Sequence, residues 1–296
     1  MSKIYHSTGK WILAGEHSVL RGSRALVFPL PSIKMSLVYD VSDRELVAHF
    51  HGATGENYQV LFYGLVDRAL EILGRSRNEI RGTIKLESNL PLGNGLGASA
   101  ALCVVVGRWL AELGWVDSGK LESFCRELEN LFHGESSGVD VAVVLSGQPL
   151  CFARYAPSEN LKIQWKPKFY LSSSGQKGFT HACVEKVKLL IQKDSLLGQQ
   201  IDDQMSRAVE TIRELLISEK SESNRELELA NAMNSARSCF ETWGLTEGAV
   251  DREMNSLIDA GALAVKPTGS GGGGFILSLW KTDPPENIKE KLIYCW

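Results

Sequence analysis

The stretch LPLGNGLGASAAL, residues 90–102, combines residue types that could do chemistry on an anion. Glycine and proline dominate its first half and small apolar residues follow, which predicts a loop that runs directly into a helix. Glycines let backbone N–H groups approach an anion closely, and a helix N-terminus adds roughly half a positive charge. The stretch therefore predicts a phosphate-binding loop. A tight turn with Ser99 as the helix N-cap explains the same residues, and the loop alone leaves both interpretations open.

Neither of the two common phosphate-loop motifs fits these residues. A Walker A loop needs GxxxxGK[ST], and no lysine follows the glycines here. A dinucleotide fingerprint needs GxGxxG and an acidic residue about twenty positions later. Gly93, Gly95 and Gly97 form GxGxG instead, and the acidic residues near that distance are Glu112, expected in mid-helix, and Asp117. The spacing argues against a dinucleotide-dependent oxidoreductase.

A second glycine-rich stretch, VKPTGSGGGGFIL, spans residues 265–277 between two runs that read as strands. Each glycine costs about 0.5–1 kcal/mol relative to alanine in regular structure, and a tight hairpin needs only two loop residues. Four consecutive glycines therefore indicate a place where the backbone approaches a ligand or another backbone closely. A floppy loop is the alternative.

Three separated motifs, in order, resemble those of the GHMP small-molecule kinases. They are GKWILAGEHSVLRG (9–22), the loop within 90–102, and KPTGSGGGG (266–274). The resemblance covers nearly the whole chain. It implies an α+β fold of two domains, an N-terminal domain like domain 2 of ribosomal protein S5 and a ferredoxin-like C-terminal domain, with the active site between them.

Within the family, GEHSVL and the segment ENLFHGESSGVD (129–140) look like those of mevalonate kinases. This resemblance implies a cytoplasmic enzyme of isoprenoid biosynthesis that uses ATP and Mg²⁺ to phosphorylate the 5-hydroxyl of mevalonate, giving 5-phosphomevalonate and ADP. Two alternatives stay open. The chain could be another GHMP kinase that acts on phosphomevalonate, a related hydroxy acid or a sugar, or a non-catalytic GHMP-fold sensor.

The resemblance also implies roles for particular residues. Asp140 is the expected general base and Lys10 its catalytic partner, while Ser99 and Glu129 are the expected Mg²⁺ ligands. Without the resemblance, Asp140 reads as a turn aspartate and Glu129 as a solvated surface residue. The expected substrate contacts are Lys10, Glu16, His17, Asp140 and Thr180. The expected ATP-binding residues are Pro91, Gly93, Asn94, Gly95, Leu96, Gly97, Ala98, Ser99, Gly271 and Gly272.

Length and composition set outer limits. The chain has 296 residues, about right for two domains, and a polar segment at 156–168 predicts limits of 1–160 and 161–296. The formal charge of −3 gives no basic field for nucleic acid or an anionic membrane. No apolar run reaches the ~18 residues of a membrane span, and the first residues lack the apolar stretch of a signal peptide. Six scattered cysteines without a CxxC predict reduced thiols. The oligomeric state stays open, with a homodimer as one expectation.

Hydrophobic periodicity predicts the main elements. Runs within 8–50 read as strands, as do 82–88, 141–147, 149–155 and 169–172, and a strand is expected on each side of the second glycine loop. The expected helices are 58–73, 98–113, 119–132, 181–194, 200–217, 224–241 and 247–260, with a last helix near the end of the chain.

Overall fold

The chain forms two compact units, each assembled from separate segments. A computed structural model describes residues 2–52, 55–133, 136–219 and 224–296. The first unit comprises Met1–Lys10, Ile33–Leu92 and Gly97–Gly147, and the second comprises Trp11–Ser32, Gly93–Leu96 and Gln148–Trp296. The predicted domain limits of 1–160 and 161–296 stay a prediction.

The first unit contains a sheet whose strands alternate buried and exposed side chains. The parallel pair β3 and β4 continues into an antiparallel pairing of β4 with the second half of β2, in the register Leu37↔Leu86. In β4, Ile84 and Leu86 are buried while Lys85 and Glu87 are exposed, as a half-buried strand requires. The strands are β1 (Lys3–Ala14), β2 (Arg24–Glu45), β3 (Val47–His51) and β4 (Arg81–Ser88).

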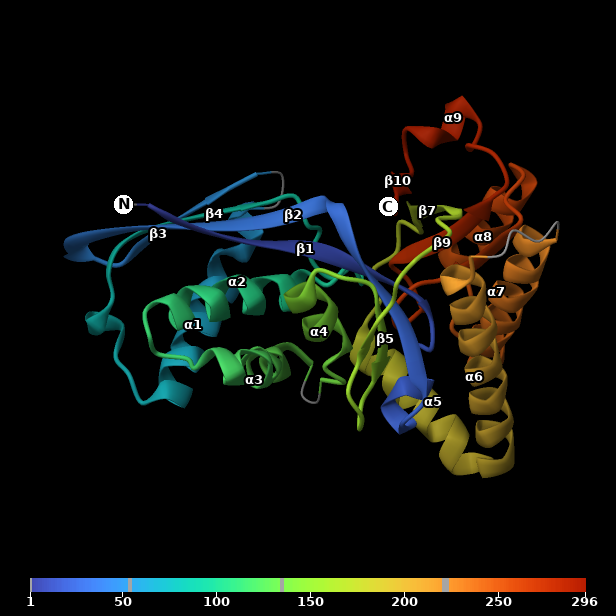
Figure 1. Cartoon of the computed structure of the whole chain (residues 1–296), viewed down its shortest axis with the longest axis horizontal. Helices are drawn as coiled ribbons and strands as arrows, with labels where there is room; N and C mark the ends of the chain where they lie inside the picture. Colours follow the sequence, from blue (N-terminus) through green and yellow to red (C-terminus); the bar gives the residue numbers. More distant parts are fainter. Residues whose placement is uncertain (1, 53–54, 134–135, 220–223) are drawn as a thin grey trace. The chain divides into compact units, whose positions relative to one another are not determined.

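Four helices lie on one face of these strands (Figure 1). The predicted buried helix after the glycine loop is confirmed, since α2 is buried along most of its length and contacts each of the other three. The amphipathic helix predicted at 119–132 is also confirmed, although its first turn is a 3-10 helix, Ser118–Lys120. The helices are α1 (Gln59–Leu73), α2 (Ala98–Glu112), α3 (Leu121–His133) and α4 (Val139–Ser146).

The strand predicted at 141–147 is wrong, because these residues form α4. Valines dominate this segment, and their β-branched side chains favour strands in isolation. Here tertiary packing decides, since the segment is buried on most sides against α2 and α3. Glycines with positive φ, Gly138 at 84° and Gly147 at 64°, begin and end the helix. Asp140 therefore lies in the first turn of a helix and does not precede a strand.

The second unit contains an antiparallel sheet with the order β10-β7-β9-β8. The first half of β2 belongs to this unit as well, where it pairs with β5, and β5 pairs with β6. The strands are β5 (Leu150–Ala153), β6 (Glu159–Asn160), β7 (Lys168–Ser173), β8 (Ala264–Pro267), β9 (Phe275–Trp280) and β10 (Ile293–Tyr294). The strands predicted at 169–172 and around the second glycine loop are thus confirmed.

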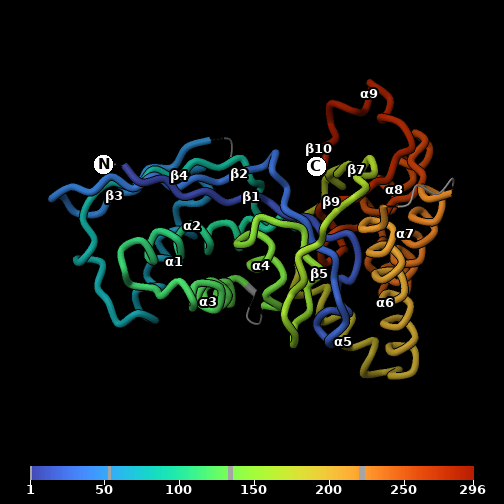
Figure 2. Tube along the Cα trace, in the orientation of Figure 1, coloured from blue at the N-terminus to red at the C-terminus, as the bar shows by residue number. Residues whose placement is uncertain are grey.

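The helices of the second unit match the predicted ones, with shifted ends. α6 starts earlier than expected because Asp194 caps it, accepting a hydrogen bond from the backbone N–H of Leu197. α6 and α7 lie side by side (Figure 2). The helices are α5 (Thr180–Lys193), α6 (Ser195–Ile217), α7 (Arg225–Thr242), α8 (Ala249–Asp259) and α9 (Glu286–Lys289).

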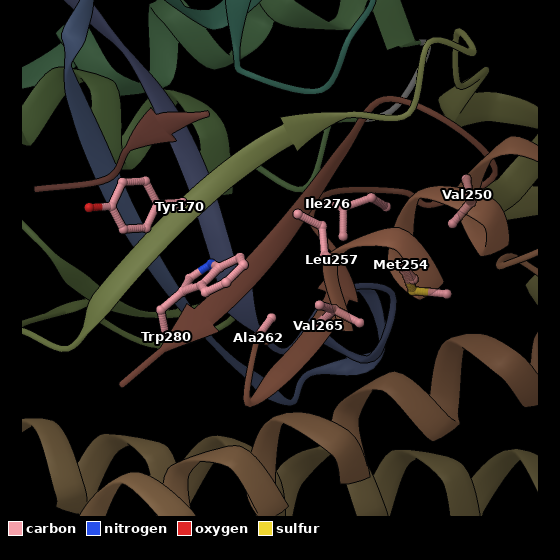
Figure 3. Close-up of a cluster of buried hydrophobic side chains, with 8 residues drawn as sticks. All are labelled: Tyr170, Val250, Met254, Leu257, Ala262, Val265, Ile276 and Trp280. Carbon is pink, nitrogen blue, oxygen red and sulfur yellow. The ribbon is translucent and has the colours of Figure 1, made fainter. Parts of the chain in front are cut away.

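One hydrophobic cluster joins α8 to the sheet of the second unit (Figure 3). Val250, Met254 and Leu257 recur at helical spacing along α8, so they share one face. That face packs against strand residues that are themselves buried. The full cluster is Tyr170, Val250, Met254, Leu257, Ala262, Val265, Ile276 and Trp280.

All six cysteines are free and buried, and the reduced state of their thiols stays a prediction. Among the helices of the described residues, none combines the length and the apolar character that crossing a membrane demands.

Two glycines in helices of the first unit give a matched test of packing. A Cβ at Gly107 in α2 would lie 2.5 Å from Cys125 Sγ and 3.1 Å from Leu121 Cδ1, whereas the exposed Gly64 in α1 has nothing within 4 Å. Alanine adds about 1 kcal/mol of helix propensity at either site, but overpacking costs about 1–3 kcal/mol. We therefore expect Gly64→Ala to raise the free energy of unfolding in urea and Gly107→Ala to lower it. A Gly107→Ala protein as stable as Gly64→Ala would contradict the close α2–α3 packing.

Candidate active site

The first glycine loop has the backbone that only glycine adopts readily. Gly93, Gly95 and Gly97 have φ values of 75°, 80° and 79°, in the left-handed region. A Cβ at Gly97 would lie 2.7 Å from Lys10 Cγ, so the lysine side chain fills the space that a larger residue would need. The loop leads straight into α2, as the sequence predicted.

The N-terminus of α2 is capped by a glycine and not by a serine. Gly97 is the N-cap and provides no side-chain hydrogen bond, so the alternative in which Ser99 is the N-cap is wrong. Ser99 lies two residues further on, in the first turn, and is half-buried. The exposed N–H groups of a helix N-terminus and the helix dipole favour negative charge at this point.

Lys10 and Asp140 form a largely buried ion pair. Lys10 Nζ lies 3.0 Å from Asp140 Oδ1, and the two side chains are 3% and 23% exposed. Lys10 comes from β1, and Asp140 comes from the first turn of α4, where the helix dipole favours a carboxylate. The geometry differs from that of a solvated turn aspartate, because this carboxylate has a buried cation as its partner.

Glu129 on α3 is 1% exposed, so its interpretation as a solvated surface residue is wrong. Its carboxylate accepts a hydrogen bond from the Ser136 hydroxyl. Burial, together with the nearby charge of Asp140, raises the Glu129 pKa to about 7. The Ser136 hydrogen bond and the charges of Lys10 and Arg126 oppose this shift only in part. Residues 134 and 135 of this segment lie outside the described residues.

Glu129 and Asp140 are thus two carboxylates whose charges influence each other, and only Asp140 forms an ion pair with Lys10, an arrangement that suits an added cation. Within the described residues, no group of three or more His, Cys, Asp or Glu side chains could hold a metal alone. A metal here would need further oxygen ligands from elsewhere, such as phosphate oxygens. Mg²⁺ fits this donor set, because it prefers hard oxygens and binds through one or two carboxylates plus substrate phosphates.

The second glycine loop, in the second unit, is held in one conformation by hydrogen bonds. Gly269, Gly271, Gly272, Gly273 and Gly274 all have positive φ. Hydrogen bonds with distant segments hold the loop: Gly272 N donates to Leu245 O (2.8 Å), Gly274 N to Gln176 O (2.7 Å), Gln176 Nε2 to Gly272 O (2.9 Å) and Cys183 Sγ to Gly271 O (3.2 Å). The floppy-loop alternative is therefore wrong.

Close backbone approach, the predicted reason for these glycines, is confirmed. A Cβ at Gly273 would lie 2.6 Å from the backbone N of Gly178. A Cβ at Gly274 would lie 2.9 Å from Asn94 O. The second glycine loop therefore packs against Asn94 of the first glycine loop, which belongs to the same unit.

The buried ion pair between Glu16 and Lys266 is a feature that sequence reasoning missed. Lys266 Nζ lies 2.5 Å from Glu16 Oε1 and donates to Pro267 O at 2.6 Å, and both charged side chains are buried. Burial lowers the Lys266 pKa, and Glu16 opposes that shift. The position of a lysine inside the apolar strand AVKP could have signalled the need for a buried partner. The Glu16 carboxylate is therefore the ion-pair partner of Lys266.

His17 and Thr180 both meet the second glycine loop at Ser270. His17 is 5% exposed, and its Nε2 lies 2.9 Å from Ser270 O. Burial lowers the His17 pKa to about 4, while the Ser270 contact opposes the shift. Thr180 begins α5, and its Oγ1 lies 3.4 Å from the Ser270 hydroxyl, which donates.

Each predicted site residue lies in one of the two units. The first unit brings together Lys10, Gly97, Glu129 and Asp140, and it also holds Pro91, Ala98 and Ser99. The second unit holds Glu16, His17, Thr180, Gly271 and Gly272, together with the loop residues Gly93, Asn94, Gly95 and the buried Leu96.

Comparisons with known proteins match most of this chain. The family model for the GHMP kinases N terminal domain matches residues 61–148, and that for the GHMP kinases C terminal region matches residues 213–296. Mevalonate kinase of Archaeoglobus fulgidus is 30% identical over 285 residues, which are 96% of this chain and 94% of that protein.

Solved structures show the same fold at lower identity. The crystal structure of L. major mevalonate kinase in complex with R-mevalonate matches with a TM-score of 0.79 and 20% identity, over 98% of this chain and 89% of that one. Phosphomevalonate kinase of Streptococcus pneumoniae matches with a TM-score of 0.73 and 18% identity, over 95% and 92% of the two chains. The two-domain α+β fold is therefore that of these kinases, and the chain belongs to the GHMP kinase family.

Proposed function

We propose that this chain is a mevalonate kinase, which transfers the γ-phosphoryl group of ATP to the 5-hydroxyl of mevalonate and forms 5-phosphomevalonate and ADP. Relatives at 25–30% identity over at least 91% of the chain carry the name mevalonate kinase, which supports this acceptor over others in the family. Buried free thiols support the cytoplasm as its location. A homodimer stays a proposal.

The observation that carries the proposal is the buried Lys10–Asp140 pair beside Glu129. Asp140 accepts the proton of the acceptor hydroxyl, or orients that hydroxyl for attack. Lys10 pairs with Asp140 and supplies positive charge where the transferring phosphoryl group gathers negative charge. A binding-only sensor would have no need of a buried lysine paired with an aspartate, so the pair favours catalysis.

The nucleotide phosphates bind at the glycine motifs. The N-terminus of α2 binds a phosphate through its backbone N–H groups and the helix dipole, and Gly95, Gly97, Gly271 and Gly272 stay proposed nucleotide contacts. Ser99 and Glu129 hold Mg²⁺, whose chemistry is to neutralise the phosphate charge. The hydroxyl of Ser99 and the raised pKa of Glu129, which reflects an incompletely balanced buried charge, support this assignment.

The acceptor contacts Lys10 and Asp140 at its reacting end. Glu16, His17 and Thr180 stay the proposed residues of the acceptor pocket. Glu16 acts there through its ion pair with Lys266, which fixes its carboxylate, while Thr180 offers a hydroxyl near Ser270.

The direct test is ADP formation by the purified protein with ATP and Mg²⁺. We expect turnover with mevalonate and none above background with phosphomevalonate or galactose. Turnover with phosphomevalonate and not with mevalonate would show that phosphomevalonate is the acceptor, while the phosphoryl transfer from ATP would stand. Binding of ATP without turnover on any of the three would favour the sensor.

The first prediction concerns the proposed base. Asp140→Asn keeps the shape but loses the charge that accepts the proton, so kcat should fall by about 10²–10⁴-fold while the Kd for ATP hardly changes. Asp117→Asn is the matched control, because Asp117 caps the 3-10 helix Ser118–Lys120 by accepting from Gly119 N. That variant should lose some stability and keep its kcat. Near-normal kcat in Asp140→Asn, with a lowered Tm, would return Asp140 to a structural role.

The next prediction concerns the metal ligands. Ser99→Ala and Glu129→Gln each remove an oxygen from the proposed Mg²⁺ site, so the Mg²⁺ concentration for half-maximal rate should rise by at least about tenfold. Glu127→Gln, on the same helix but with a half-exposed side chain, is the control. Identical Mg²⁺ titrations for the Glu129 and Glu127 variants would remove Glu129 from the metal site.

A further prediction concerns the second glycine loop. A Cβ at Gly272 (φ 68°) would lie 2.8 Å from Cys183 Sγ, whereas one at Gly147 (φ 64°) meets nothing within 4 Å. Both alanine variants carry the same backbone strain, so the contrast isolates the displacement of the loop. Gly272→Ala should raise the KM for ATP by about tenfold, equivalent to about 1.4 kcal/mol, and Gly147→Ala should not. Equal KM values in two folded variants would exclude this loop from nucleotide binding.

A further inference from the structure

His17 is held in a backbone conformation that other side chains rarely adopt. Its φ of 58° makes it the one non-glycine residue with positive φ among those that the structure describes. With its ψ of −48°, the residue lies in a sparsely populated region outside the left-handed helical one, and the N–H of Ser18 donates to Glu16 O across it. Such strain persists where surrounding contacts determine it, and it clusters at functional sites.

The contacts of the imidazole ring define its hydrogen-bonding state. Nε2 lies 2.9 Å from the carbonyl oxygen of Ser270, which can only accept, so Nε2 carries the hydrogen. The ring also packs edge-on against Trp243, with centroids 5.0 Å apart, and Phe240 lies next to both rings. Burial keeps the pKa of His17 at about 4, so the ring is neutral and Nδ1 is left as an acceptor.

An ion pair also joins the turn after β1 to the strand that leads into the second glycine loop. Glu16 immediately precedes His17, and its partner Lys266 lies just before the loop that contains Ser270. The ammonium of Lys266 also lies 5.1 Å from the centre of the Phe240 ring. The turn after β1 and the second glycine loop are therefore joined by an ion pair and by the His17–Ser270 hydrogen bond.

We propose that His17 is a positioning residue for the nucleotide: its Nε2–H bond to Ser270 holds the loop 268–274 in the conformation that receives the phosphate chain of a nucleoside triphosphate. The nucleotide part of this inference rests on the proposed function. The proposal gives His17 a loop-anchoring role in addition to its expected contact with the acceptor. Nδ1 is the ring atom that could make that acceptor contact.

The energetic reason lies in the glycines that follow Ser270. Residues 271–274 are all glycine, which loses more conformational freedom on ordering than any other residue. An anchor that orders the loop in the free protein removes this cost from nucleotide binding, because preorganisation spares binding energy. Losing the anchor should therefore weaken ATP binding while the chemical step stays the same.

Two substitutions at the same position isolate the hydrogen bond. His17→Phe keeps an aromatic ring against Trp243 but has no donor, and His17→Gln restores an N–H donor near the position of Nε2. Both carry the same backbone strain. We expect His17→Phe to raise the KM for ATP about tenfold and His17→Gln to restore most of that loss, whatever either substitution does to the KM for mevalonate. Equal KM values for the two variants, or a rise confined to the KM for mevalonate, would overturn the proposal.

Two readouts that need no activity separate this proposal from the proposed function. Hydrogen exchange of peptides covering 268–274 in the nucleotide-free protein should be faster in His17→Phe than in wild type or His17→Gln. The ¹⁵N imidazole spectrum of wild type should show the Nε2–H tautomer, even if His17→Phe does not fold. Unchanged exchange in a folded His17→Phe, or the Nδ1–H tautomer, would refute the anchor. A wild type inactive on mevalonate would refute only the proposed function.

Discussion

The ammonium of Lys10 is almost fully buried 3.0 Å from Asp140, and the remainder of the first unit's site is arranged around it. The stem of Lys10 occupies the space beside Gly97, so the glycine loop can pass only because it has no side chain there. A buried charge is costly unless it is paired, so the lysine in turn requires the carboxylate at the start of α4. One cation thereby links a strand, a loop and a helix N-terminus.

Glu129 explains why this arrangement suits chemistry better than stability. Its pKa, raised to about 7, reports that burying a second carboxylate near Asp140 is unfavourable without a further cation. A protein selected only for stability would place an apolar residue there. Strongly perturbed carboxylates cluster at functional sites, and here the perturbation has a named charge partner.

Sequence reasoning succeeded where the signal was local and failed where it was not. The glycine loop, the buried α2 and the strand–loop–strand around residues 265–277 follow from residue types within short windows. The helix α4 was missed because its valines favour a strand, and only packing against α2 and α3 overrides them. The Glu16–Lys266 and His17–Ser270 contacts join residues about 250 positions apart, and no periodicity in the chain encodes such a pairing.

The family resemblance supplied an expectation that local patterns could not, namely that Lys10, Glu129 and Asp140 act together. A double-mutant cycle on Lys10→Met and Asp140→Asn, measured as kcat at saturating ATP and mevalonate, tests that claim most directly. If the two residues act as one unit, the double variant should lose about as much kcat as the more damaging single variant. A loss equal to the product of the two single losses would mean that the residues act independently, and it would contradict the account.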